Sequence, residues 1–221
     1  MTFSIAARQD GRFGMAVSSS SPAVAARCAH LRPGIGVAAS QNVTDPRLGG
    51  RILDRLAVHG DADRAISEVG ETATDLDYRQ LTAVGPTGPA AWFSGKFTLG
   101  THGAAVGAHS VAAGNLLATS EVPRIMVNAF EAATGELEER LLAALRAGLD
   151  GGGEAGPVHS AGLVVVADVE WPVTDLRVDW SESPIDDLAG ALQVWLPQRD
   201  DYVRRGLQPS TAPSYGVPGD Q

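Results

Sequence analysis

Basic residues, cysteine and long hydrophobic runs are all scarce in this sequence. Its 17 lysine and arginine residues are outnumbered by 26 acidic ones, which gives a formal net charge of −9, and they form no cluster along the chain. Binding to nucleic acid through phosphate neutralisation needs a basic surface, so we expect no nucleic-acid partner. No segment approaches the ~20 consecutive apolar residues that span a bilayer, so we expect no membrane insertion.

Cys28 is the only cysteine, which excludes an internal disulfide. No histidine or second cysteine lies at zinc-site spacing from it, which favours a small buried side chain over a metal ligand. Residues 85–89 are rich in glycine and proline, but no helical pattern follows them directly, so they predict a turn and not a phosphate-binding loop. Because no dinucleotide fingerprint is present either, we predict no metal site and no cofactor.

The amino-terminal residues lack the charged region and the apolar stretch of a secretory signal peptide, so we expect a soluble, cytoplasmic protein. With 221 residues, 44% of them hydrophobic, the chain suits one sizeable domain. The residues after Leu207 are rich in proline, serine and glycine and have little to bury. The sequence therefore predicts a domain over residues 1–206 and a tail over 207–221 that is disordered or lies on a partner subunit.

The spacing of apolar residues predicts both strands and helices. Asp10-Gly11 is a strong hairpin signal because glycine accepts a positive φ. Asp45-Pro46 supplies a helix N-cap followed by proline at the first helical position. Strands are expected at residues 2–8, 12–18, 34–41, 80–84, 90–94, 106–117, 160–168 and 175–179, and helices at 46–59, 61–69, 122–134, 137–149 and 184–196. Residues 151–156 contain too much glycine to order themselves.

The order of these elements indicates the fold class. Strands come as hairpins, then helices come as a pair, and then strands return, which differs from the strict alternation of a doubly wound parallel sheet. Two antiparallel sheets stacked face to face, with helices outside both, fit this order. We therefore predict an α/β (α+β) fold with four layers, an αββα sandwich.

Thr2 carries the chemistry that the sequence suggests. Methionine aminopeptidase removes Met1 efficiently when the next side chain is small, and this leaves a free α-amine on Thr2. An ordinary α-amine has a pKa of about 7.7–8.0, so near neutrality it accepts a hydroxyl proton directly or through one water. One residue then serves as nucleophile and as general base. The alternative is that Thr2 is simply the first residue of a strand.

Short segments in a fixed order resemble a known family. Residues 2–8 and 14–19 resemble the start of proteasome β subunits. They are more closely similar to a bacterial family of unknown function, domain-of-unknown-function family 1028, which has the N-terminal-nucleophile (Ntn) hydrolase fold and is often mislabelled as a pilin protein. The resemblance covers roughly residues 2–205 and includes residues 39–41, 45–46, 49, 94–95, 113–117, 160–165 and 175–179. It implies the four-layer Ntn sandwich.

The resemblance also implies a set of site residues. Thr2 is the expected nucleophile, with Ser19, Gln41 and Asn115 as polar neighbours. Gly114 and Asn115 are candidate donors, through a backbone N–H and a side-chain amide, to the oxyanion of a tetrahedral intermediate. For Asn115 the alternative is an ordinary turn asparagine.

Three further residues are candidates for substrate binding. Asp45 stands where relatives carry asparagine before proline, so the pocket is expected to differ there. Lys96, the only lysine, lowers the pKa of the α-amine if it lies nearby; otherwise it is an exposed loop residue. His102 is either a proton carrier or an ordinary loop histidine.

Two functional hypotheses follow. The first is an amidohydrolase that cleaves a small linear or cyclic amide C–N bond through a threonyl ester. The second is a catalytically inactive Ntn fold that serves as an oligomeric binding or scaffold protein. A serine hydrolase that uses residues 18–21 ranks last, because they lack the Gly-x-Ser-x-Gly elbow. In either main hypothesis we expect a homodimer or a higher homo-oligomer.

Overall fold

Two antiparallel sheets form the centre of the molecule, in a computed structural model that describes residues 2–219. The larger sheet has six strands in the order β10-β9-β2-β1-β8-β7, and the smaller has four in the order β3-β4-β5-β6. The strands are β1 (Thr2–Gln9), β2 (Arg12–Ser19), β3 (Ala29–Arg32), β4 (Gly36–Asn42), β5 (Arg79–Val84), β6 (Ala91–Ser94), β7 (Gly103–Val106), β8 (Ser110–Asn115), β9 (Ser160–Val166) and β10 (Pro172–Val178). The first strand of the chain therefore lies inside the larger sheet.

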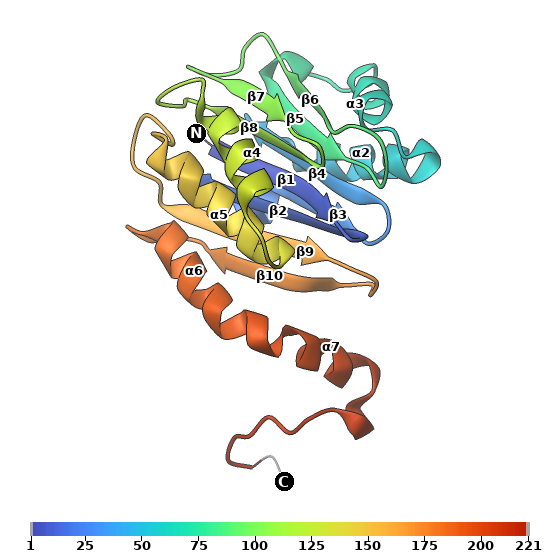
Figure 1. Ribbon diagram of the computed structural model, residues 1–221. Helices are drawn as coiled ribbons and strands as arrows, with labels where there is room; N and C mark the ends of the chain where they lie inside the picture. Colours follow the sequence, from blue (N-terminus) through green and yellow to red (C-terminus); the bar gives the residue numbers. More distant parts are fainter. Residues whose placement is uncertain (1, 220–221) are drawn as a thin grey trace.

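Helices cover the outer face of each sheet (Figure 1). α4, α5 and α6 pack on the larger sheet, and α2 and α3 pack on the smaller one. The helices are α1 (Ala25–Cys28), α2 (Pro46–His59), α3 (Ala62–Gly70), α4 (Val122–Ala132), α5 (Leu137–Asp150), α6 (Pro184–Trp195) and α7 (Arg199–Leu207), with 3-10 turns at Leu76–Tyr78, Leu196–Gln198 and Pro209–Thr211. α7 continues beyond α6 as an arm that contacts β10, with Val203 packed against the core of the larger sheet.

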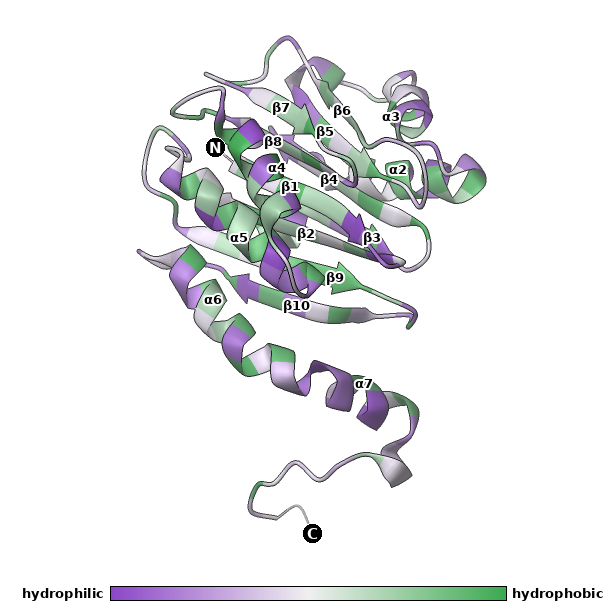
Figure 2. Cartoon of the chain, viewed as in Figure 1, coloured by the Kyte–Doolittle hydropathy of each residue, from purple (hydrophilic) through white to green (hydrophobic). Residues whose placement is uncertain are grey.

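Three layers of buried side chains hold these elements together. Phe3 and Leu145 belong to the core between the larger sheet and its helices. Met15 and Val37 belong to the core between the two sheets, and Ile52 belongs to the core under α2 and α3. Figure 2 shows hydrophobic colour on the sheets and on much of α4 and α5, whereas α7 is mostly hydrophilic. The helix-sheet-sheet-helix arrangement confirms the predicted four-layer αββα sandwich.

Local sequence signals explain where several elements begin and end. Asp10 (φ 50°) and Gly11 (φ 78°) form the turn between β1 and β2, as the Asp-Gly pair predicts. The Asp45 side chain accepts the Arg47 backbone N–H at the start of α2, so the predicted N-cap is confirmed. Gly60 ends α2 in the left-handed region at φ 72°.

One expectation about local structure is wrong, and another holds only for the segment taken by itself. Residues 106–117 form no single strand, because β7 and β8 pair as a hairpin that turns at 107–109. Residues 151–156 are ordered by neighbours distant in sequence: the backbone N–H of Ala118 donates to the Gly153 carbonyl, and the N–H of Ala155 donates to the Leu116 carbonyl, each at 3.0 Å. The end of β8 thus supplies the hydrogen bonds that a glycine-rich segment cannot supply itself.

Arg199 ties the arm to the domain. Its Nη1 lies 3.0 Å from Glu136 and 3.1 Å from Glu138, and Arg12 pairs with the same two carboxylates. Glu138 is completely buried. The predicted boundary between domain and tail at residue 206 falls in the last turn of α7, which is fixed at its first residue by these ion pairs, and the division into two parts stays a prediction.

Candidate functional site

Thr2 begins β1 and faces the space between the two sheets. Side chains alternate along a strand. Phe3 belongs to the core under the helices, whereas Ala6 belongs to the core between the sheets, so Thr2 shares the inter-sheet face with Ala6. On one side Thr2 pairs with Asn115, the last residue of β8, and on the other side β2 ends at Ser19. Three strand ends therefore meet at this residue.

The Thr2 hydroxyl lies in a row of hydroxyl groups. Its Oγ1 is 3.5 Å from Ser19 Oγ, which is in turn 2.8 Å from Ser21 Oγ. Thr2 is 4% exposed in the chain that still begins with Met1. Met1 lies outside the described residues, so its removal stays a prediction.

Buried amide side chains connect the two sheets at the same end. Gln80 Oε1 accepts hydrogen bonds from Gln41 Nε2 at 2.8 Å and from Asn115 Nδ2 at 3.2 Å. Gln80 Nε2 donates to the Gly114 carbonyl at 3.1 Å. Gln41 Oε1 accepts the Ser4 hydroxyl at 2.8 Å. The structure thus joins the predicted residues Gln41, Gly114 and Asn115 through a residue that the prediction omitted.

The network fixes the orientation of the Asn115 amide. Gln80 Nε2 also donates to Ser94 Oγ at 3.0 Å, so both N–H groups of Gln80 are used, and Asn115 must turn its own N–H side toward the Gln80 carbonyl. Asn115 Oδ1 is left buried without a hydrogen-bond partner among residues 2–219. This residue therefore offers an acceptor atom at the end of β8, beside Thr2 in the ladder.

Gly114 also has a packing role. A Cβ atom there would lie 2.6 Å from Leu117 Cδ2, so the glycine lets Leu117 pack against the end of β8. Its proposed role as a backbone donor to an oxyanion is a separate hypothesis that this packing leaves open.

The three predicted substrate-binding residues are held by other partners. The Asp45 carboxylate contacts Arg47. Lys96 Nζ forms an ion pair with Asp77 at 2.8 Å on an exposed loop. His102 is exposed, and its Nδ1 lies 3.0 Å from the Gly100 carbonyl. None of the three is hydrogen-bonded to the amide network among the residues that the structure describes, so their substrate-binding roles stay predictions.

Asp45→Ala is expected to lower the free energy of unfolding by about 1 kcal/mol at neutral pH, because the N-cap of α2 is lost. The Arg47 side chain holds the pKa of the Asp45 carboxyl down at about 2, from an ordinary 3.8. A depressed pKa means that the stabilisation is complete above the unfolded-state value and is lost as the pH falls through about 2. Urea unfolding at neutral and acid pH measures this loss.

Asp45→Asn is the matched variant, since it keeps an oxygen that caps the helix but removes the charge. Asp45→Asn should lose only the stabilisation that comes from the ion pair with Arg47, which is the part that depends on pH. A difference between wild type and Asp45→Ala that stays constant into acid would contradict this account of the ion pair.

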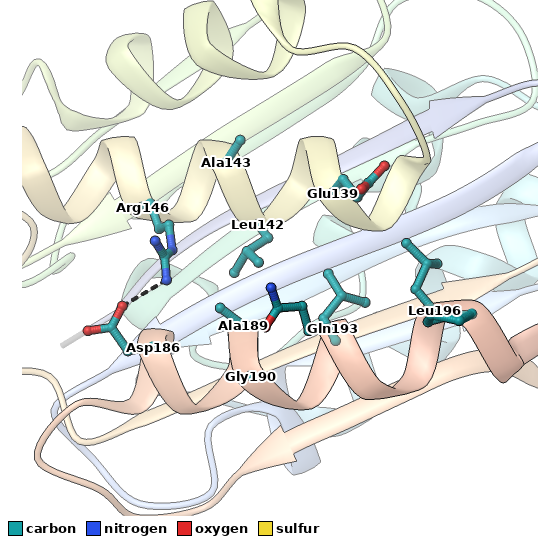
Figure 3. Close-up of a pocket in the computed structure, with 11 residues that line it drawn as sticks. Glu139, Leu142, Ala143, Arg146, Asp186, Ala189, Gly190, Gln193 and Leu196 are labelled. Carbon is teal, nitrogen blue, oxygen red and sulfur yellow. Dashed lines mark hydrogen bonds and ion pairs between the residues drawn. The ribbon is translucent and has the colours of Figure 1, made fainter.

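A large cavity lies away from Thr2, between α5 and α6 (Figure 3). Its volume is about 740 Å³. An ion pair between Arg146 and Asp186 crosses it at 2.8 Å, and Leu142 and Leu196 contribute apolar surface. Thr2 and the amide network do not line this cavity, so it is separate from the candidate site.

Over residues 2–219, no group of three or more histidine, cysteine, aspartate or glutamate side chains is arranged to hold a metal ion. Within the same range no helix is long and apolar enough to cross a membrane.

A family comparison accounts for most of the chain. Residues 2–188 match the sequence model of a family described as a family of unknown function (DUF1028). The chain belongs to the DUF1028 family. The match begins at Thr2 and ends within α6, so the family region includes both sheets and all the site residues named above. The predicted resemblance to this family is confirmed, and comparison with curated proteins gave no match.

Solved structures agree with the family assignment. A crystal structure of a DUF1028 protein from Silicibacter pomeroyi is 29% identical, covers 92% of this chain and 90% of its own, and has a TM-score of 0.83. Eukaryotic HslV from Trypanosoma brucei is 12% identical over 74% of this chain and 98% of its own, with a TM-score of 0.46. Anbu, an ancestral β-subunit from Yersinia bercovieri, is 11% identical over 88% and 97%, with a TM-score of 0.40. The two looser likenesses add nothing to the family assignment.

Sequence reasoning missed two residues of the site. Gln80 is the second residue of β5. The only sequence feature that could have indicated it is its polarity: with Thr82 it makes one face of an otherwise apolar strand polar. Glu154 lies in the glycine-rich segment, yet it is 4% exposed and its carboxylate accepts the backbone N–H of Ser20. Both depend on contacts between segments far apart in the chain.

Proposed function

We propose that this DUF1028 protein is an Ntn-type amidohydrolase that cleaves a small linear or cyclic amide C–N bond. The observation that carries the proposal is the position of Thr2, the first residue of a central strand, with Ser19 and Asn115 at the ends of the two neighbouring strands. A hydroxyl on the terminal residue itself supplies a nucleophile, and the α-amine released by removal of Met1 supplies a base. The role of Met1 removal is part of the proposal.

The proposed reaction has two halves. In the first, Thr2 Oγ1 attacks the amide carbonyl carbon while the α-amine accepts the hydroxyl proton. The tetrahedral intermediate collapses as the C–N bond breaks, and the leaving nitrogen takes the proton from the α-ammonium. In the second half, water gives a proton to the amine and attacks the threonyl ester, which releases the acid and restores Thr2.

The neighbouring residues have distinct proposed roles. Ser19 orients the Thr2 hydroxyl, from which its Oγ is 3.5 Å away. Gln41 acts through Gln80 to hold Asn115. The proposed oxyanion donors are the backbone N–H of Gly114 and the second N–H of the Asn115 amide, whose first N–H is bound to Gln80. One such donor contributes about 3 kcal/mol in known hydrolases.

The loop over residues 95–102 is the proposed rim for substrate. The backbone N–H groups of Leu116 and Leu117 donate to the carbonyls of Leu99 and Thr101, so the loop packs directly after Asn115. Lys96 and His102 belong to this loop and provide a cation and an imidazole at the rim. Asp45 acts indirectly, because its carboxylate is committed to the start of α2.

An acyl-trapping experiment tests the proposal. The Thr2-initiated protein is incubated with small amides, lactams and hydantoin-like rings, quenched in acid, and weighed intact. A mass gain equal to the acyl group, mapped to the amino-terminal peptide, is the expected result because the ester precedes hydrolysis. Adducts on another residue, or turnover without any adduct at Thr2, would reject Thr2 as the nucleophile.

The inactive-scaffold alternative makes a different prediction. If natively produced protein retains Met1 in essentially all molecules, the amine of Thr2 stays in a peptide bond, and the protein acts as a binding or scaffold component. Intact mass of the native protein separates these cases. The predicted homodimer or higher homo-oligomer is tested on the same sample by light scattering.

A further inference from the structure

Glu154 lies across the end of β1. Its backbone is tied to the segment after β8, through a bridge to Leu117 and a hydrogen bond from the Ala155 N–H to the Leu116 carbonyl. Its carboxylate reaches the backbone N–H of Ser20, directly after β2, with Oε1 at 3.0 Å and Oε2 at 3.2 Å. β1 lies between β2 and β8, and neighbouring strands are about 4.8 Å apart. The Glu154 side chain runs from the segment after β8 to the residue after β2, so it must pass the first residue of β1.

A second acceptor faces the same position from β8. Asn115 pairs with Thr2 in the ladder, and its Nδ2 is committed to Gln80. Its Oδ1 is buried and has no donor among residues 2–219. Buried polar atoms in native proteins are nearly always hydrogen-bonded, so this oxygen has the capacity to accept a donor placed at the end of β1.

We propose that Glu154 and Asn115 Oδ1 together bind the α-ammonium group of Thr2 in the processed chain. Both are positioning residues, and the inference rests on the proposed function of Thr2. A terminal ammonium carries several N–H donors, and these two acceptors approach it from the β2 and β8 sides of the strand end. The pair holds the amine beside its own hydroxyl and determines the pH at which the amine becomes a base.

The charges around the amine have opposing effects. The negative charge of Glu154 favours the ammonium form and raises the pKa of the amine, while burial of the amine lowers it. Burial likewise raises the pKa of the Glu154 carboxyl, and the hydrogen bond from Ser20 opposes this. Because the two groups interact, their apparent pKa values belong to the pair.

Other titratable and charged groups approach from the neighbouring elements. His159, before β9, donates its backbone N–H to the Ser19 carbonyl at 2.8 Å, and its ring stacks on Trp180. Arg27 of α1 donates to Ser21 Oγ. These groups are unchanged by a substitution at Glu154, so a comparison of variants isolates the effect of that carboxylate.

The single lysine makes a direct titration of the amine feasible. The chain is released from an amino-terminal fusion so that it begins at Thr2, and its amines are reductively monomethylated with a limiting amount of ¹³C-formaldehyde, which leaves two N–H donors on the protonated α-amine. Only the Thr2 α-amine and Lys96 Nζ carry the label. Their ¹³C shifts are followed by NMR from roughly pH 5 to 11, a range that brackets the ordinary pKa values of both amines.

Glu154→Gln should lower the pKa of the α-amine by about one unit, that is, about a tenfold change in the ratio of its two forms. Glutamine keeps an oxygen for the Ser20 N–H and removes only the charge. Asn115→Asp keeps the acceptor oxygen and adds a charge, so it should raise the same pKa by a similar amount. The Lys96 signal should titrate identically in all variants.

Glu131→Gln is the matched control, because that carboxylate also accepts a backbone N–H, from Ala108 at the opposite end of β8. It should leave the α-amine unchanged. Equal α-amine pKa values in wild type and Glu154→Gln would overturn the inference even if the protein cleaves amides. A lowered value in a protein that cleaves no amide would support the inference and reject the proposed hydrolase.

Discussion

Thr2→Ala should lose amide turnover, with kcat/KM at least about 1000-fold below wild type on any substrate found in the amide, lactam and hydantoin screen. Alanine leaves the α-amine and the strand in place but removes the only atom that forms the ester. When a nucleophile is removed from a group of catalytic residues that act together, kcat/KM falls by at least this factor. The catalysis that remains comes from substrate binding and from the oxyanion donors alone. Steady-state rates at saturating and limiting substrate measure the loss.

Two comparisons make the Thr2→Ala result decisive. Thr2→Ser retains a hydroxyl beside the amine and should retain measurable turnover. Thr2→Ala should lower the free energy of unfolding by about 1–2 kcal/mol and leave the protein folded, because it removes one hydroxyl and one methyl group while the backbone pairing of β1 stays in place. Undiminished turnover in a correctly folded Thr2→Ala protein would remove Thr2 from the mechanism.

Gln80→Leu should lower the free energy of unfolding by about 3–5 kcal/mol, since each buried polar group left without a partner costs about 1–3 kcal/mol. The substitution removes a hydrogen-bond partner from three buried groups: the amide of Gln41, the amide of Asn115 and the Gly114 carbonyl. Chemical unfolding in urea, followed by tryptophan fluorescence, measures the change. Any catalytic activity should fall as well, because Asn115 loses its support.

Thr82→Val is the matched control on the same strand. Thr82 is two residues from Gln80, is equally buried, and its Oγ1 has no hydrogen-bond partner among the described residues. Replacement by a valine of similar shape should therefore be neutral or stabilising. If Gln80→Leu and Thr82→Val had the same small effect, the amide network would contribute little to the fold.

Local chemistry made much of this fold predictable. The Asp10-Gly11 turn and the Asp45 cap act within a few residues, so their signals are complete in the sequence. The four layers follow from the order of strands and helices. The hairpin of β7 and β8 was missed because its turn, Gly107-Ala108-His109, lacks an Asn-Gly or Asp-Gly pair and small apolar residues continue on both sides of it.

The candidate site was predictable only in part. The family resemblance identified Thr2, Ser19, Gln41 and Asn115 one by one, and the structure links them by hydrogen bonds in two groups. Gln80, which completes the amide group, depends on the register between β5 and β4 and on the stacking of the two sheets. Neither distance along the chain nor periodicity contains that information.

Glu154 shows the same limit for a different reason. Its segment is rich in glycine, which predicts disorder when the chain is considered alone. The hydrogen bonds that order it come from Leu116 and Ala118, after β8, and from Ser20, after β2. A tertiary contact thus overrides the local preference, and it does so where the proposed site needs a fixed carboxylate.

The alternation along β1 restricts how the chain can be processed. Thr2 faces the gap between the sheets, whereas the ring of Phe3 lies in the core beneath α4 and α5. Loss of one residue presents a hydroxyl to the site, but loss of two would leave the amine on a residue whose side chain points to the opposite side of the sheet. Under the proposed mechanism, an aminopeptidase that trims one position too far would therefore remove the nucleophile from the site.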